Sequence, residues 1–255
     1  LHNLFAIDMK WSKDNLSPFF NWDKNYEAIN LWKVYLWATR VSPDLVSVLK
    51  RGLIKTLVKK DQLRKHADRS CQLFTFCSLI YPKSFTHKET RELLLKTDAD
   101  GRAEILDTLQ KQVFAAGKDS GTFWINRAEP WIESSWPKDL KFIDQKTSKA
   151  FALAAIGAGL EFERAVDVVL KFIQEIKEPS NVIYRLNSMK VDDKPLVKSF
   201  PLPALKLMNT IISDQSKWLN QKWRDVLDQI GSADKSLIET DYYKRIDEFL
   251  RKKGK

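Results

Sequence analysis

The sequence predicts an all-α protein, built of antiparallel helix pairs that are stacked as a HEAT-like helical-repeat array. The chain has only eight glycines and nine prolines in 255 residues, too few for the many tight turns of a β-sandwich or barrel. Apolar residues recur at three- and four-residue spacing, and no segment shows the alternation typical of strands. The predicted helix pairs follow one another every ~35–45 residues, which is the spacing of HEAT-type repeats.

The first helix pair is predicted between residues 25 and 60. Residues 25–40, NYEAINLWKVYLWATR, place Trp32 and Leu36 on one face. Residues 42–60 follow with a leucine every fourth position from Leu45 to Leu57. Ser42 is a good N-cap for this helix, and the next residue, a proline, suits its first position. Because the connection between the two helices is short, we expect them to be antiparallel.

The remaining helices follow in the same style. A third helix is predicted for residues 61–81, and others for 87–97 and 101–116. Residues 147–176 predict two helices that are broken near Gly157 to Leu160. Further helices are predicted for 204–213, 216–231 and 241–254, with 191–203 as a looser connection. Gly117 suits a helix end because glycine adopts the left-handed cap conformation cheaply.

The segment GKDSG, Gly117 to Gly121, predicts the division between two halves of one continuous solenoid-like unit. The N-terminal helical half covers residues 1–118, and the C-terminal helical half covers residues 119–255. Since the chain begins at Leu1 and not at Met, we expect it to be a fragment of a longer protein.

The composition restricts the location and the chemistry of the protein. Cys71 and Cys77 lie six residues apart, which fits neither a zinc site nor a redox pair, so we expect reduced core thiols. Reduced cysteines and no recognisable signal peptide lead us to expect a cytoplasmic protein. No apolar run approaches the ~18–20 residues of a membrane span, so no membrane partner is expected.

Motifs that carry catalysis are missing from the sequence. The only histidines are His2, His66 and His87, and none has a partner at metal-ligand spacing. There is no phosphate-binding loop and no nucleophile elbow. We therefore expect no catalytic, cofactor-binding or metal-binding residue and no cofactor. If the longer protein is an enzyme, its catalytic domain should lie upstream.

Positive charge gathers between residues 50 and 69, against only two acids and a net charge of +10 for the whole chain. Arg51, Lys55 and Lys59 share the helix face opposite the leucine stripe. This cluster is a candidate surface for a polyanion or an acidic partner, and the alternative is an ordinary solvated helix surface. The candidate residues are Lys50, Arg51, Lys55, Lys59, Lys60, Arg64, Lys65 and Arg69.

A second candidate is the aromatic segment NRAEPWIESSWPKDLKFIDQK at residues 126–146. It is interpreted as a structural corner formed by Arg127, Pro130, Trp131, Trp136 and Pro137. We expect both indoles to be buried, Pro130 to stand near a helix break, and Arg127 to pair with Glu133 or stack on an indole. The alternative is an acid–base cluster of Arg127, Glu129 and Glu133, which lacks a nucleophile or a histidine.

The second half of the chain carries a succession of short signatures. Arg127 and Trp131 are followed by WPKD from Trp136, GLEFERAVDVV from Gly159, FPLPALKLMNTII from Phe200 and SLIETDYYKRIDEFLRKKG from Ser236. This order resembles the C-terminal helical (HEAT-like) region of large multidomain bacterial proteins with N-terminal SIR2-like or NTPase domains, many linked to anti-phage defence. The matched positions are structural, so the resemblance transfers no active site.

The resemblance and the fold class together imply a non-catalytic module. We expect an interaction, sensor or scaffold module that binds a protein partner, such as a phage protein or another subunit, through a helical-repeat surface. The alternative is a helical nucleic-acid-binding module that uses the basic face of residues 50–69.

Overall fold

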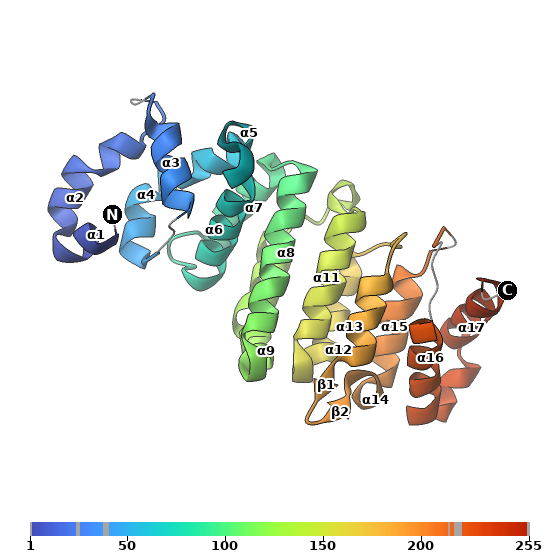
Figure 1. Cartoon of the computed structure of the whole chain (residues 1–255). Coiled ribbons are helices and arrows are strands. Elements are labelled where there is room, and N and C mark those ends of the chain that lie inside the picture. Colours follow the sequence, from blue (N-terminus) through green and yellow to red (C-terminus); the bar gives the residue numbers. More distant parts are fainter. Residues whose placement is uncertain (1, 24–25, 38–40, 214, 217–220, 254–255) are drawn as a thin grey trace. The chain divides into compact units, whose positions relative to one another are not determined.

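A computed structural model describes residues 2–23, 26–37, 41–213, 215–216 and 221–253 of the chain. The prediction of an all-α fold with packed helix pairs is confirmed (Figure 1). Contacts divide the chain into two compact units. The first unit comprises Leu1–Thr108 and Ser134–Pro137, and the second comprises Leu109–Glu133 and Lys138–Lys255. The units divide between Thr108 and Leu109, within the helix Ala99–Ala115. The sequence instead places the boundary between its two halves after residue 118, and this boundary stays a prediction.

The first unit is built of short helices and single helical turns. In chain order they are α1 (His2–Ile7), α2 (Met9–Asn15), η1 (Ser17–Phe20), α3 (Ala28–Trp37), α4 (Pro43–Val58), α5 (Lys60–Leu63), η2 (Arg64–His66), α6 (Ala67–Ile80), α7 (His87–Lys96) and the start of α8 (Ala99–Ala115). Helix α6 packs against both α3 and α4, and η1 packs against the same two helices. The ends predicted for the first helix, at residues 25 and 38–40, lie outside the described residues.

Helix α4 forms as its sequence predicts. The Ser42 side chain accepts a hydrogen bond from the Leu45 backbone N–H, and Pro43 occupies the first helical position. Leu45, Leu49, Leu53 and Leu57 are buried along one face. This buried stripe fixes the opposite face, which carries Arg51, toward solvent and toward neighbouring elements.

The prediction of one helix over residues 61–81 is wrong. Arg64 adopts a positive φ of 51°, which is costly for a residue with a Cβ and interrupts the helix. The segment therefore becomes α5, the turn η2 and α6. Cys71 and Phe74 are buried on α6 as expected.

The second unit begins within α8. Its elements are the end of α8, η3 (Gly117–Asp119), α9 (Ser120–Phe123), η4 (Trp124–Ala128), α10 (Glu129–Ser135), η5 (Leu140–Phe142), α11 (Gln145–Gly157), η6 (Gly159–Glu161), α12 (Phe162–Val169), η7 (Leu170–Phe172), α13 (Ser180–Ser188), β1 (Lys190–Val191), β2 (Lys194–Pro195), α14 (Leu196–Ser199), α15 (Pro201–Ile211), α16 (Gln221–Ala233), η8 (Lys235–Glu239) and α17 (Asp241–Lys253). Gly117 has the positive φ of 56° that its role at a helix end requires. The first residues of the helix predicted from 216, positions 217–220, lie outside the described residues.

Helices of the second unit are arranged in two rows (Figure 1). In one row α11 packs on α13 and α13 on α16, and in the other α12 packs on α15 and α15 on α17. Contacts of α11 with α12 and of α16 with α17 join the rows. A helix that contacts its pair partner and its counterpart in the next pair is the packing rule of helical repeats. The turn between α11 and α12 contains Gly159, whose φ is 63°.

A small hairpin replaces part of the loose connection expected at residues 191–203. Strands β1 and β2 pair antiparallel, with Lys190 opposite Pro195 and Val191 opposite Lys194. The two turn residues, Asp192 and Asp193, both have positive φ, as a two-residue type I′ hairpin turn requires. Such a turn favours Asn-Gly, so an Asp-Asp pair gives only a weak sequence signal.

The aromatic corner is buried as predicted. Trp131 and Trp136 are 1% and 0% exposed, and Pro137 is buried beside them in sequence. Pro130 does not end a helix, because the preceding residues Trp124–Ala128 form a π-helical turn that changes the hydrogen-bond pattern before the proline. Because a π-helical turn shifts the backbone hydrogen bonds by one residue, the helix can continue although Pro130 has no N–H to donate. The expected helix break is therefore an irregular turn, and α10 continues to Ser135.

Within the described ranges, none of the helices has both the length and the apolar character needed to cross a membrane.

Candidate ligand pocket and basic surface

Arg51 and Lys55 of α4 and Lys59 at its C-cap share one side of the helix, as their spacing predicts, and this side faces the segment that follows η1. Arg51 and Lys55 both form ion pairs with Asp23, the Arg51 Nη2–Asp23 Oδ2 distance being 3.4 Å. One turn further, the Lys59 ammonium lies 5.8 Å from the centroid of the Trp22 ring. The residues at positions 51, 55 and 59 therefore form one row along α4, above Trp22 and Asp23.

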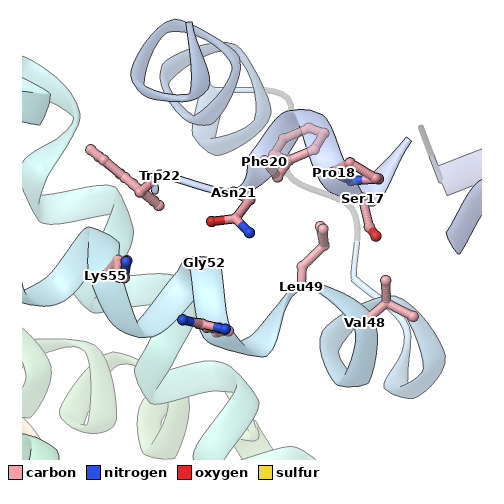
Figure 2. Close-up of a pocket in the computed structure, with 10 residues that line it drawn as sticks. Ser17, Pro18, Phe20, Asn21, Trp22, Val48, Leu49, Gly52 and Lys55 are labelled. Carbon is pink, nitrogen blue, oxygen red and sulfur yellow. The ribbon is translucent and has the colours of Figure 1, made fainter. Parts of the chain in front are cut away.

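Beside this row lies a cavity of about 230 Å³ between η1 and α4. Figure 2 shows Phe20, Asn21 and Trp22 on one side of it and Leu49 and Lys55 on the other. Its walls combine apolar side chains with the Arg51 guanidinium. The lining residues are Ser17, Pro18, Phe20, Asn21, Trp22, Val48, Leu49, Arg51, Gly52 and Lys55.

The floor of the cavity depends on a close approach at Gly52. The fully buried Trp32 donates its indole N–H to the Phe20 carbonyl at 3.0 Å and thereby ties η1 to α3. The Phe20 and Trp32 rings meet edge to face, with centroids 5.4 Å apart. A Cβ on Gly52 would lie 3.0 Å from Trp32 Cε2 and 3.1 Å from the Phe20 carbonyl oxygen. Glycine is therefore required here for α4 to dock against these two aromatic residues.

Asp23 sets the electrostatics of the cavity rim. The hydrogen bond from Lys55 is the main cause that lowers the pKa of the Asp23 carboxyl, and Arg51 and Lys59 lower it further through their charges. Asp23 is therefore ionised near neutral pH, and one carboxylate faces three cations. The Arg51 side chain remains 80% exposed, whereas that of Lys55 is only 25% exposed. The rim keeps a net positive charge, and Arg51 is its accessible cation.

Two residues that line the cavity, Asn21 and Trp22, carry hydrogen-bonding side chains. The Trp22 indole N–H is shielded from solvent, and no acceptor for it is found among the described residues. The Asn21 side-chain oxygen accepts from the Asp23 backbone N–H at 3.0 Å, which leaves the amide NH₂ as the donor end. A buried donor without an acceptor is unusual in a native protein.

The other cations between residues 50 and 69 do not join this row. Lys50 pairs with Glu89 at 2.6 Å, and that hydrogen bond is the main cause that lowers the Glu89 pKa. Lys60 pairs with Asp98 at 2.6 Å, and Arg69 Nη1 donates to the Gln72 side chain at 2.9 Å. Only Arg64 and Lys65 are simply exposed, on the turn η2. The single eight-residue basic face is thus divided into separate, partly neutralised sites.

Acids of the aromatic corner are also occupied within the second unit. Glu129 is 8% exposed, accepts two hydrogen bonds from Arg164 at 2.7 and 2.8 Å, and accepts a third from the Trp124 indole at 3.1 Å. Glu133 pairs with Lys171 at 3.1 Å instead of the expected Arg127. A carboxylate that is fixed by a bidentate arginine and an indole acts as a structural anchor.

The thiols of Cys71 and Cys77 and the hydroxyl of Ser135 are enclosed in the first unit. Burial raises the pKa of the Cys71 and Cys77 thiols to about 12, and both are free cysteines in the core. His87 Nδ1 lies 2.9 Å from Ser135 Oγ, a pair that sequence reasoning missed. Ser135 is fully buried, so its hydroxyl ties α7 to the end of α10 and is not open to a substrate. In the part of the chain that the structure describes, no three metal-ligating side chains converge.

Sequence reasoning also missed the η1 side of the cavity. The segment SPFFNWD carries Phe20, Trp22 and Asp23, but its partners on α4 lie 28 and 32 residues further along the chain. The available signal was the proline at the start of a turn followed by aromatic residues and an acid. That pattern predicts a turn and gives no information on which helix it faces.

Comparison with known proteins finds a distant similarity. The chain is 22% identical over 156 residues to the uncharacterized protein y4cA of Sinorhizobium fredii. The match covers 61% of this chain and 13% of that much longer protein. No protein-family model matches the chain, and no solved structure matches it.

Proposed function

We propose that this chain acts by binding a protein partner through its helical surface and not by catalysis. It would serve as an interaction, sensor or scaffold module of a larger bacterial defence-type protein. The observation that carries the proposal is the concentration of exposed, large apolar side chains on α1, α2, η1, α3 and the segment between η1 and α3.

Half of the exposed large apolar residues of the described chain fall within positions 4–37. They are Leu4, Ile7, Met9, Trp11, Phe19, Tyr26, Val34 and Trp37. Tyr26, Ile7 and Trp37 are 89%, 82% and 78% exposed. Val34 and Trp37 stand three residues apart on α3, which places them on one helix face. Large apolar side chains that gather at the surface are typical of interaction sites.

Two further observations support a module that binds. The two-row packing of the second unit is the arrangement by which stacked helix pairs present an extended surface without catalytic groups. The related sequence in Sinorhizobium fredii forms 13% of a longer protein, so similar sequence occurs as one part of a larger chain. The resemblance to helical regions that accompany SIR2-like or NTPase domains extends the proposal to anti-phage defence. The proposal also includes a catalytic domain upstream and a cytoplasmic location, where the two core thiols stay reduced.

The test is co-purification with variants matched for chemistry. Trp37→Glu places a charge on the exposed face of α3, and Leu140→Glu makes the same kind of change at a residue of the second unit that is 77% exposed. Partners from phage-infected and uninfected bacteria are identified by mass spectrometry, and each is then titrated as a purified protein. We expect one specific partner whose affinity falls by about tenfold or more with Trp37→Glu and is unchanged with Leu140→Glu. Failure to recover any specific partner, or equal binding by both variants, would contradict the proposal.

Nucleic-acid binding is the second candidate function. It is favoured by Arg64 and Lys65, which are exposed together on η2, and by the accessible Arg51. A filter-binding titration against DNA and RNA at several salt concentrations tests it, because each phosphate contact adds to the salt slope. The slope should fall when Arg64 and Lys65 are reversed to Glu. A slope that does not change would exclude this surface.

A further inference from the structure

We propose that the cavity between η1 and α4 is the recognition site for a peptide segment of the partner in which an acidic residue stands next to a large apolar one. An aromatic or aliphatic side chain of the segment enters between Pro18, Phe20 and Leu49, and a neighbouring carboxylate of the segment binds Arg51. This inference rests on the proposed function, since it names the chemistry by which a protein partner is recognised.

The size of the cavity favours a side chain over a free small molecule. Pockets for small molecules usually enclose about 300–1,000 Å³, whereas this cavity encloses about 230 Å³. Protein interfaces, in contrast, are often anchored by one large side chain in a small, well-packed pocket. The walls suit such an anchor because Pro18, Phe20 and Leu49 supply apolar surface on both sides.

The positive charge at the rim of the cavity favours an acidic residue next to the apolar side chain of the peptide. Among the described residues, Asp23 is the carboxylate found in ion pairs with Arg51 and Lys55, and the charge of Lys59 also acts on it. The Lys55 side chain is largely covered and hydrogen-bonded to Asp23. The Arg51 side chain is 80% exposed, and its ion pair with the same acid is longer, at 3.4 Å. Arg51 can therefore take a second carboxylate in a bidentate geometry, for which a guanidinium is well suited.

A free amide donor at the cavity favours a ligand with oxygen acceptors. The donor end of the Asn21 amide lines the same cavity. A carbonyl oxygen of a bound peptide backbone can accept a hydrogen bond from this amide.

A nucleic-acid backbone fits this site less well. A phosphate chain needs a row of open cations, but here Asp23 stands between Arg51 and Lys55 and Lys59 lies over an indole. The negative charge of Asp23 repels a run of phosphates, whereas a single carboxylate at Arg51 lies at the outer edge of the rim. The site therefore favours a peptide with one or two acids beside an apolar residue.

The experiment uses an array of octapeptides of Gly and Ser that carry Phe, Trp, Leu or Ile at the centre, flanked by Glu or by Lys. We expect the intact chain to bind Glu-flanked peptides and not their Lys-flanked counterparts. The tightest peptide is then titrated by fluorescence anisotropy. Its affinity should fall about tenfold or more with Arg51→Glu, which removes a charge-assisted hydrogen bond. Val48→Trp, which fills the cavity, should weaken it similarly.

A control variant and a folding measurement distinguish a specific effect of Arg51 from a general effect of charge or from unfolding. Lys83→Glu makes the same charge reversal at an exposed residue outside the cavity and should leave peptide binding unchanged, and circular dichroism should show that each variant is folded. Equal binding of Glu- and Lys-flanked peptides, or binding unaffected by Arg51→Glu, would overturn the inference. Binding of labelled oligothymidylate in place of the peptides would assign the site to nucleic acid. If Arg51→Glu retains the partner that Trp37→Glu loses, only the pocket inference fails and the proposed function stands.

Discussion

Replacing Gly52 by alanine should destabilise the first unit, although alanine is the better helix former. In the interior of α4 the intrinsic gain from Gly to Ala is about 1 kcal/mol. The new Cβ would lie 3.0 Å from Trp32 Cε2 and 3.1 Å from the Phe20 carbonyl oxygen. Ordinary carbon–carbon contacts are about 3.5–4.0 Å, so either α4 or the indole must move.

The indole has little freedom to move. Trp32 is 0% exposed, and its N–H is bound to the Phe20 carbonyl at 3.0 Å. Overpacking of a filled core costs about 1–3 kcal/mol, and the obstruction by backbone at Phe20 places this case at the upper end. After the helix-propensity gain is subtracted, we expect a net loss of about 2 kcal/mol in the free energy of unfolding.

Urea unfolding, followed by far-UV circular dichroism and by tryptophan fluorescence, measures this loss. Ser47→Ala provides the control because it lies on the same helix, at an exposed position. It should change stability by no more than about 0.5 kcal/mol. If Gly52→Ala were as stable as the original protein while Ser47→Ala behaved as expected, the close packing of α4 on Trp32 would be refuted.

Three further predictions concern the core and the ion pairs. Trp131→Ala should cost about 3–5 kcal/mol in urea unfolding, because this indole is 1% exposed. Lys50 lowers the pKa of Glu89 in the folded state, so the stability that this pair contributes should be present above the ordinary Glu value of 4.5 and lost as the pH falls below it. Lys50→Met should flatten that part of the pH–stability curve. Because burial raises the thiol pKa of Cys71 and Cys77 to about 12, a thiol reagent at mildly alkaline pH should label neither cysteine until the protein is unfolded.

Local signals in the sequence were sufficient for most helices. Ser42 caps α4 as predicted, and the leucine stripe from Leu45 to Leu57 is buried. The break after Gly157 and the helix end at Gly117 also appear in the structure. These features depend on residues within about four positions of one another, because caps and helix faces are formed by the first turns and by i, i+4 neighbours.

Two local irregularities had no readable signal. Arg64 takes a positive φ although it is not a glycine, so nothing in its residue type announces the end of α5. Pro130 follows a π-helical turn, whereas the usual rule predicts that a proline ends or kinks a helix. In both cases the backbone departs from the local preference of the residue.

The sequence by itself determined the all-α class, the buried stripe of α4 and the row formed by Arg51, Lys55 and Lys59. Only the tertiary structure decided what that row faces. Asp23 comes from 28 residues before Arg51 and 32 before Lys55, and Lys50 finds its acid 39 residues further on. Helical periodicity fixes which side chains share a face, but it contains no information on which distant segment packs there. The cavity and the charge that remains open at its rim therefore exist only once η1 is held against α4 by Trp32 and Gly52.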